Sequence, residues 1–175
     1  MALACVNVDL DSLGHYCRIH GYPETLLTPS AARAVYHVAL PRLVELFDEA
    51  GVRATFFAVG ADLDDERSAQ ALASASAAGH EVGNHTFRHD YALTRGSPTE
   101  IAEDVSRGAD AIARVVGARP LGFRAPGYTL TAPLLQVLAD QGYRYDSSAF
   151  PAAPYRAAKA LVMGALSVVG RESRA

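Results

Sequence analysis

The chain alternates between short apolar runs and longer segments with helical periodicity. Runs in which apolar residues alternate with small or polar ones, or which are rich in valine and phenylalanine, predict buried strands. Five such runs occur. They begin near Ala4 and continue at residues 52–60, 80–85, 121–127 and 143–150.

Five helical segments are predicted after these strands, at 30–51, 65–79, 97–117, 131–142 and 155–169. Ser30 is expected to cap the first helix, and Pro41 to mark a break or a fresh start within it. The third opens with Ser97, Pro98 and Glu100, a combination typical of a capping box with proline in the first turn. The long polar segment 12–30 carries no predicted element.

Strands that alternate with helices predict an α/β fold with a parallel sheet and right-handed crossovers. An open doubly wound sheet is one possibility, although no glycine-rich phosphate loop follows the first strand. The other is a (β/α) barrel that stops early, because a full barrel takes about 250 residues and this chain has 175. No repeat or linker divides the chain, so residues 1–175 are expected to form a single domain.

Composition narrows the class of protein. Half of the residues are hydrophobic, a fifth are charged and the net charge is -3, so no basic surface for nucleic acid is expected. The N-terminus lacks the basic and apolar regions of a signal peptide, and the apolar stretch 157–170 contains Lys159 and is too short to span a membrane. A cytoplasmic location without a membrane span is therefore expected, with Cys5 and Cys17 as free thiols.

Reactive side chains gather where the predicted strands end. The carboxyl ends of parallel strands meet at one edge of a sheet, so groups placed there are expected to lie close together. Two aspartates that end the first strand are two residues apart and therefore share a face. The groups at this edge are Asp9, Asp11, His85, His89, Arg124, Tyr128 and Asp146.

The spacing of two of these histidines indicates a metal site. If the chain turns helical after the third strand, His85 and His89 point to the same side. Two histidines and one carboxylate leave open positions on zinc or another divalent first-row metal. Residue 86 is threonine, which excludes an HExxH motif with its glutamate base. We therefore expect one of the two aspartates to bind the metal and the other to take a proton from water.

The remaining histidines and acidic residues have other interpretations. His80 begins a strand, away from the candidate site, and is expected to be structural. His15 and His20 lie in the polar segment and could contact substrate, whereas His37 has no identifiable partner. Four acidic residues are interpreted as solvated surface: Asp62, Asp64, Asp65 and Glu81.

Five segments, in order, resemble the polysaccharide deacetylases with a NodB-like domain (carbohydrate esterase family 4). They are "NVDLDS", "ATFFAVG", "GHEVGNHTFRH", "FRAPGY" and "YRYDSSAF", which together run from residue 6 to 150. The resemblance implies a distorted (β/α) barrel of about seven units, of which this chain would hold the first five. It also implies a metal-dependent hydrolase that removes an acetyl or formyl group from the nitrogen of an amino sugar or related amide, with a glycan or small molecule as substrate.

The resemblance assigns roles position by position. Asp9 matches the general base, and Arg124 matches the arginine that orients it. Tyr128 matches the residue whose backbone N–H stabilises the oxyanion. The ligands of zinc, or of another divalent metal, fall on Asp11, His85 and His89.

The chain departs from the family pattern in three places. Leu10 separates the two aspartates, as in branches that resemble cytoplasmic peptidoglycan deacetylases and lipid-linked aminoarabinose deformylases. Ala149 and Phe150 replace an acidic residue and a tryptophan. The Leu-x-His that supplies the general acid is not found, since no histidine follows Phe150.

These departures lead to the expectation of a truncated deacetylase that turns over poorly alone. Its unclosed sheet could drive homo-oligomerisation. Two alternatives remain open. One is an allantoinase-like cyclic-amide hydrolase, and the other is an inactive carbohydrate- or metal-binding module.

Overall fold

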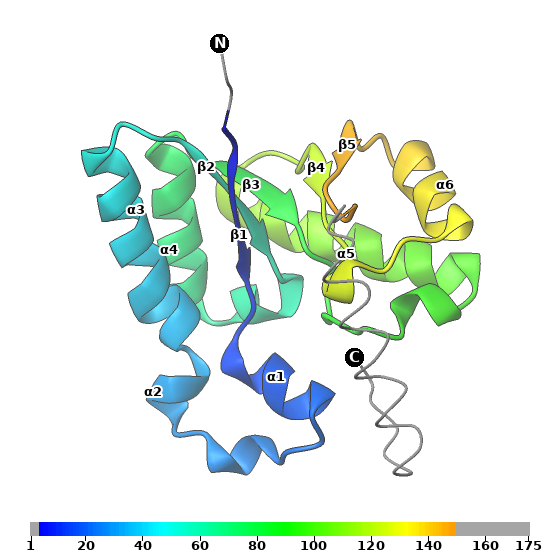
Figure 1. Ribbon diagram of the computed structural model, residues 1–175, viewed down its shortest axis with the longest axis horizontal. Coiled ribbons are helices and arrows are strands. Elements are labelled where there is room, and N and C mark those ends of the chain that lie inside the picture. The colour runs from blue at the N-terminus through cyan, green and yellow to red at the C-terminus, as the bar shows by residue number, and fades with distance from the viewer. Residues whose placement is uncertain (1–3, 150–175) are drawn as a thin grey trace.

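A computed structural model describes residues 4–149 as one parallel sheet with helices beside it (Figure 1). The strands pair in chain order, β1-β2-β3-β4-β5, and every neighbouring pair is parallel. Their bounds are β1 Val6–Leu10, β2 Ala54–Ala58, β3 Glu81–Asn84, β4 Gly122–Phe123 and β5 Tyr145–Asp146. All five predicted strands are confirmed, each shorter than the run that predicted it. Phe150 and the helix predicted over 155–169 lie outside the described residues.

The α-helices of the described part are α1 Leu13–Ile19, α2 Pro29–Ala32, α3 Leu40–Glu49, α4 Glu66–Ala77, α5 Pro98–Val116 and α6 Ala132–Asp140. From α3 to α6, each helix packs against the next one along the chain (Figure 1). Right-handed crossovers between strands in sequential order place their helices on the same face. A doubly wound sheet would instead reverse its strand order at a switch point. The arrangement is therefore that of the barrel alternative.

The helix starts follow the sequence signals with two exceptions. Ser97 and Glu100 form the predicted capping box of α5. Pro41 lies in the first turn of α3, which continues directly from a π-helix, η2, at Val35–Ala39, so Pro41 marks a change of helix type rather than the predicted break or fresh start. The other exception is the cap of α2. Thr28 rather than Ser30 accepts the N–H of Ala31, at 3.2 Å, so the predicted Ser30 cap is wrong.

The polar segment 12–30 is more ordered than its sequence indicates. It contains α1 and a 3-10 turn, η1, at Glu24–Leu26. Helix α1 has seven residues, and the Ser12 side chain caps none of its N–H groups. A helix this short is marginal alone, so its contacts with α2 and η1 are what stabilise it.

The two faces of the sheet differ in chemistry. Leu10 and Phe56 belong to an apolar core shared with the helices. Asp9 lies opposite Phe57 in the β1–β2 register. Because successive side chains of a strand point to opposite faces, Asp9 and Phe57 lie on the face of the sheet away from Leu10 and Phe56. Gly83 makes room there, because a Cβ at this position would lie 2.5 Å from the Phe57 ring. Among residues 4–149, no helix is long and apolar enough to cross a bilayer.

Candidate metal centre and active site

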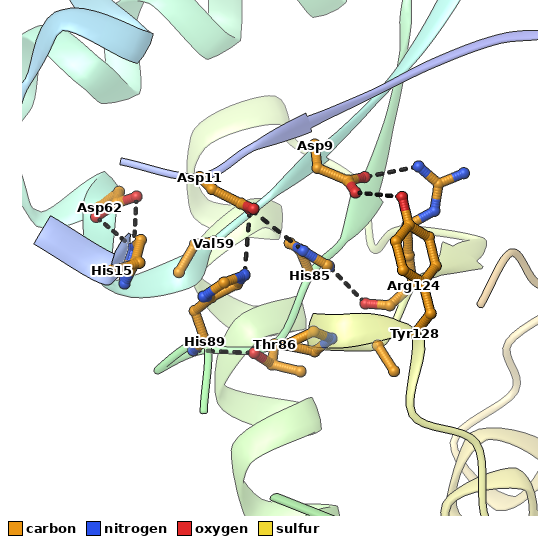
Figure 2. A network of polar contacts seen from close by, with 12 residues as sticks. Asp9, Asp11, His15, Val59, Asp62, His85, Thr86, His89, Arg124 and Tyr128 are labelled. Atoms are coloured by element: carbon orange, nitrogen blue, oxygen red, sulfur yellow. Dashed lines mark hydrogen bonds and ion pairs between the residues drawn. The ribbon is translucent and has the colours of Figure 1, made fainter. Parts of the chain in front are cut away.

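Asp11, His85 and His89 converge at the carboxyl edge of the sheet (Figure 2). Asp11 follows β1, and the two histidines follow β3. One ligand atom from each residue lies within 4.8 Å of the others. Asp11 Oδ1 is 3.3 Å from His85 Nε2 and 3.2 Å from His89 Nε2. The predicted trio of metal-competent side chains is thus brought together.

A tight turn, not a helix, places the histidine pair. Thr86 and His89 both have positive φ, 68° and 54°, and the N–H of His89 donates to Thr86 Oγ1 at 3.1 Å. The helical turn that the spacing argument assumed after the third strand is therefore not formed. The convergence of His85 and His89 comes instead from two left-handed residues, a conformation that sequence spacing does not reveal.

The donor set fits a cation. His85 Nδ1 lies 2.6 Å from the carbonyl oxygen of Arg124. A carbonyl only accepts, so Nδ1 carries the proton and Nε2 turns a lone pair toward Asp11. Asp11 Oδ1 and both ring nitrogens of His89 are buried without a hydrogen-bond partner among the described residues. Facing lone pairs in a buried site repel one another, and a divalent ion between them would remove that cost.

Charge and burial favour the ligand forms of these groups. Burial acts to raise the pKa of Asp11, but the adjacent imidazoles of His85 and His89 outweigh it and hold that pKa well below its ordinary value. Burial lowers the pKa of His89 below its ordinary 6.5. At neutral pH the aspartate is therefore ionised and the imidazole neutral, as metal ligation requires.

Asp9 is held by the guanidinium of Arg124. Arg124 Nη1 donates to Asp9 Oδ1 at 2.7 Å (Figure 2). Two further hydrogen bonds fix the orientation of the guanidinium. Its Nε donates to the carbonyl oxygen of Ser147 at 3.1 Å, and its Nη2 donates to the Ser147 hydroxyl at 2.7 Å. The guanidinium also lies over the Phe57 ring, 4.3 Å from its centroid. Arg124 thus ties the end of β4 to β1 and orients the Asp9 carboxylate.

Tyr128 approaches the site with its side chain. Its hydroxyl donates to Asp9 Oδ2 at 3.5 Å, while its backbone N–H donates to the carbonyl oxygen of Ala125 at 3.1 Å. The residue is in the left-handed region, with φ 56°. The family resemblance implies a role for the backbone N–H of Tyr128 only, so the contact of its hydroxyl with Asp9 was not predicted.

His15 and Asp62 form a pair beside the metal centre that the sequence did not indicate. His15 is buried, and its Nε2 lies 3.0 Å from Asp62 Oδ2. Its ring packs against His89 with centroids 4.8 Å apart, and its Nδ1 contacts the Arg18 guanidinium. Asp62 is therefore not solvated surface. His15 braces His89, and both of its nitrogens have partners.

Tyr16 of α1 also faces the carboxylates. Burial and then the negative charges of Asp11 and Asp9 raise its pKa above the ordinary value. Beyond His15 and Ser12, a cleft of about 930 Å³ opens between α1, α2 and the start of α4. It mixes positive and negative groups, among them Arg18, Arg33, Arg67, Asp62, Asp64 and Asp65.

Three other candidates lie away from the metal ligands. His80 Nδ1 accepts the N–H of Ala54 at 3.1 Å, which supports its structural interpretation. His37 has a partner after all, since its Nε2 is 2.7 Å from Asp65. Asp146 accepts the N–H of Ser148 at 3.1 Å and so orders the segment that bonds Arg124.

Comparison with known proteins gives a consistent result. Residues 34–145, more than half of the chain, match the sequence model of a family described as polysaccharide deacetylase. A peptidoglycan deacetylase of Helicobacter pylori is 27% identical over 147 residues, which cover 83% of this chain and 49% of that protein. The chain therefore spans about half the length of this curated relative.

Solved structures share the fold. A Mycobacterium smegmatis protein assigned as a polysaccharide deacetylase superposes with a TM-score of 0.69 at 27% identity, over 81% of this chain and 49% of that one. A family 4 acetyl xylan esterase from Clostridium thermocellum, solved in complex with a cobalt ion, gives a TM-score of 0.57 at 22% identity. That alignment covers 76% of this chain and 53% of the esterase.

Proposed function

The chain belongs to the polysaccharide deacetylase family, and from that premise we propose that it carries the metal centre of a hydrolase that removes an N-acyl group from an amino sugar. The observation that supports this most is the convergence of Asp11, His85 and His89 beside the Arg124-bound Asp9. An esterase with the same fold was solved in complex with a cobalt ion, which also supports a metal-dependent reaction. Zinc is the proposed ion, because two imidazoles and one carboxylate suit it.

The chemistry divides between the two aspartates. A divalent ion held by Asp11, His85 and His89 would lower the pKa of a coordinated water molecule and polarise an amide carbonyl. Asp9 is not part of the ligand trio. Arg124 occupies Oδ1 at 2.7 Å, so a proton would be accepted at Oδ2, whose contact with the Tyr128 hydroxyl is long at 3.5 Å. We assign Asp9 as general base and Arg124 as the group that fixes its orientation.

Two tyrosines border the same space. The Tyr128 hydroxyl, 3.5 Å from Asp9 Oδ2, can donate to Asp9 or to a substrate oxygen. Tyr16, whose pKa is raised, stays protonated at neutral pH and can donate as well. The cleft beside His15 offers the hydroxyl-binding carboxylates and guanidinium groups that a sugar chain requires, so we place an extended glycan there.

Proton delivery to the leaving amine is a separate requirement. His15 lies close to the centre, but Asp62 and Arg18 occupy its two nitrogens. Its contacts support a bracing role rather than that of the acid. An activated acetyl ester needs little protonation of its leaving group, so comparing ester with amide substrates isolates this step.

The test is acyl release by the zinc-loaded chain. The substrates are N-acetylglucosamine oligosaccharides, a formamido sugar, allantoin and an activated acetyl ester, and the matched control is Asp9→Asn. Acetate or formate release from a sugar, lost in Asp9→Asn, is the expected result. If allantoin is the only substrate hydrolysed, the chain is a cyclic-amide hydrolase and the proposed deacylation of an amino sugar is wrong. Zinc-loaded chain that leaves every substrate intact would identify an inactive module.

A further inference from the structure

The turn between the two ligand histidines is held by a buried carboxylate. Asp104 lies on α5 with 1% of its surface exposed. Its Oδ1 accepts the backbone N–H groups of Phe87 and Arg88 at 3.2 and 3.1 Å, and its Oδ2 accepts the Arg88 N–H at 3.3 Å. A buried charge is costly unless it is well hydrogen-bonded. Here its partners are the amides that separate His85 from His89, together with the Arg88 guanidinium, whose Nε lies 3.5 Å from Oδ2.

The same turn is pinned from its other side. The carbonyls of Thr86 and Phe87 accept the N–H groups of Gly60 and Ala61, both at 2.9 Å. Gly60 and Ala61 begin the 3-10 turn η3, Gly60–Asp64, which follows β2. The backbone of residues 86–88 is therefore clamped between η3 and α5.

A glycine lets α5 approach this closely. Gly108 lies one helical turn after Asp104, on the same face of α5. A Cβ at Gly108 would stand 2.4 Å from Asn84 Oδ1 and 2.9 Å from the carbonyl carbon of Thr86. The helix thus contacts the backbone of the turn directly, and Asp104 reaches its amides.

Clamping is needed because the turn is strained. Thr86 and His89 occupy the left-handed region, which non-glycine residues hold only when their surroundings enforce it. Without the clamp, the turn would relax and His89 would move relative to His85. The Nε2 atoms would then no longer both face Asp11.

We propose that Asp104 is a positioning residue, which presets the separation of His85 and His89 so that both imidazoles face Asp11 before a metal ion binds. This inference rests on the proposed metal centre. It assigns to a helix outside the ligand set a share of the metal affinity, because partners that orient ligands typically contribute about 10- to 100-fold in metal affinity.

The test compares Asp104→Ala and Asp104→Asn with Asp110→Asn on the same helix. Asp110 is exposed and pairs with Arg119 at 2.6 Å, so its variant controls for the loss of a charge on α5. Zinc affinity is measured by chelator competition at a temperature where circular dichroism shows each variant folded. Asp104→Ala should weaken zinc binding about tenfold or more. Asp104→Asn should weaken it less, since its amide oxygen still accepts one N–H, and Asp110→Asn should match the wild type.

Amide hydrogen exchange of the metal-free chain gives a readout that does not depend on zinc. The Phe87 and Arg88 amides should be protected in the wild type and in Asp110→Asn, and should exchange faster in Asp104→Asn. Exchange in the wild type as fast as in Asp104→Asn would overturn the proposal, even if Asp104→Ala does not fold. Wild-type zinc affinity in a folded Asp104→Ala would also overturn it. A wild-type chain that binds no zinc would refute the metal centre instead, while the exchange result still decides the role of Asp104.

Discussion

Arg124→Met should destabilise the chain strongly, because one guanidinium serves three acceptors. The substitution keeps an unbranched apolar stem but removes the donors to Asp9 and Ser147 and the guanidinium that lies over the Phe57 ring. Methionine is close in volume to the arginine stem, so packing loss is small. The expected cost is therefore that of the polar contacts.

The magnitude follows from burial. The side chains of Arg124 and Asp9 are 10% and 20% exposed, much closer to a buried pair, whose breakage costs about 3–5 kcal/mol, than to a surface pair worth about 0.2–1 kcal/mol. Discounting for the exposed fraction gives about 2 kcal/mol for the contact with Asp9. Each bond to Ser147 adds about 1 kcal/mol, so Arg124→Met should cost about 4 kcal/mol.

Urea denaturation of four proteins isolates the Asp9 share. The wild type, Arg124→Met, Asp9→Ala and the double variant form a cycle whose coupling energy should be about 2 kcal/mol. Arg124→Lys should recover only part of the loss, because one ammonium cannot reproduce the planar fork. A coupling energy below about 0.5 kcal/mol, the level of a surface pair, would refute the view that Arg124 holds Asp9.

Three further outcomes are expected. Asp9→Asn should keep wild-type zinc affinity but lower kcat on an N-acylated substrate by about 10²- to 10⁴-fold; a loss of zinc binding would mean that Asp9 is a ligand. Burial lowers the pKa of His80 below 6.5. As pH falls, His80 is therefore protonated in the unfolded chain before it is protonated in the folded one. The free energy of unfolding should then fall as pH drops below about 6.5. His80→Gln should flatten that slope by at most about 1.4 kcal/mol per pH unit, measured by urea denaturation, and an unchanged slope would contradict it. Gly108→Ala should destabilise by about 1–3 kcal/mol despite its better helix propensity, since its Cβ would meet Asn84 at 2.4 Å, whereas the exposed Glu103→Ala should shift stability by less than about 0.5 kcal/mol.

The strands and the edge that carries the chemistry were predictable because both follow from local patterns, whereas the strand order, which decides between a doubly wound sheet and a barrel, was left open. Alternation along β1 places Asp9 and Asp11 on one face whatever the rest of the chain does. Strong caps such as Ser97 with Glu100 mark a helix start from within a few residues. Helix α1 was missed for the same reason, since it has no side-chain cap and is stabilised by tertiary contacts.

The contacts that hold the site residues in place could not be predicted from the sequence, because they join residues far apart along the chain. Asp62 reads as a surface residue until α1 brings His15 to it. Asp104 is one acid among several on an amphipathic helix, and only its contact with the amides of residues 87 and 88 distinguishes it. The left-handed Thr86 and His89 carry no sequence signal, because neither is a glycine.

Zinc titration of the metal-free chain tests the central claim most directly. Calorimetry on the wild type and on Asp11→Asn compares two proteins that differ by one ligand atom, and circular dichroism checks that both are folded. The account predicts one zinc ion bound per wild-type chain, with binding to Asp11→Asn lost or greatly weakened, because Asp11 Oδ1 is the atom that faces both His85 and His89. No zinc binding by the folded wild type, or equal binding by both proteins, would contradict it.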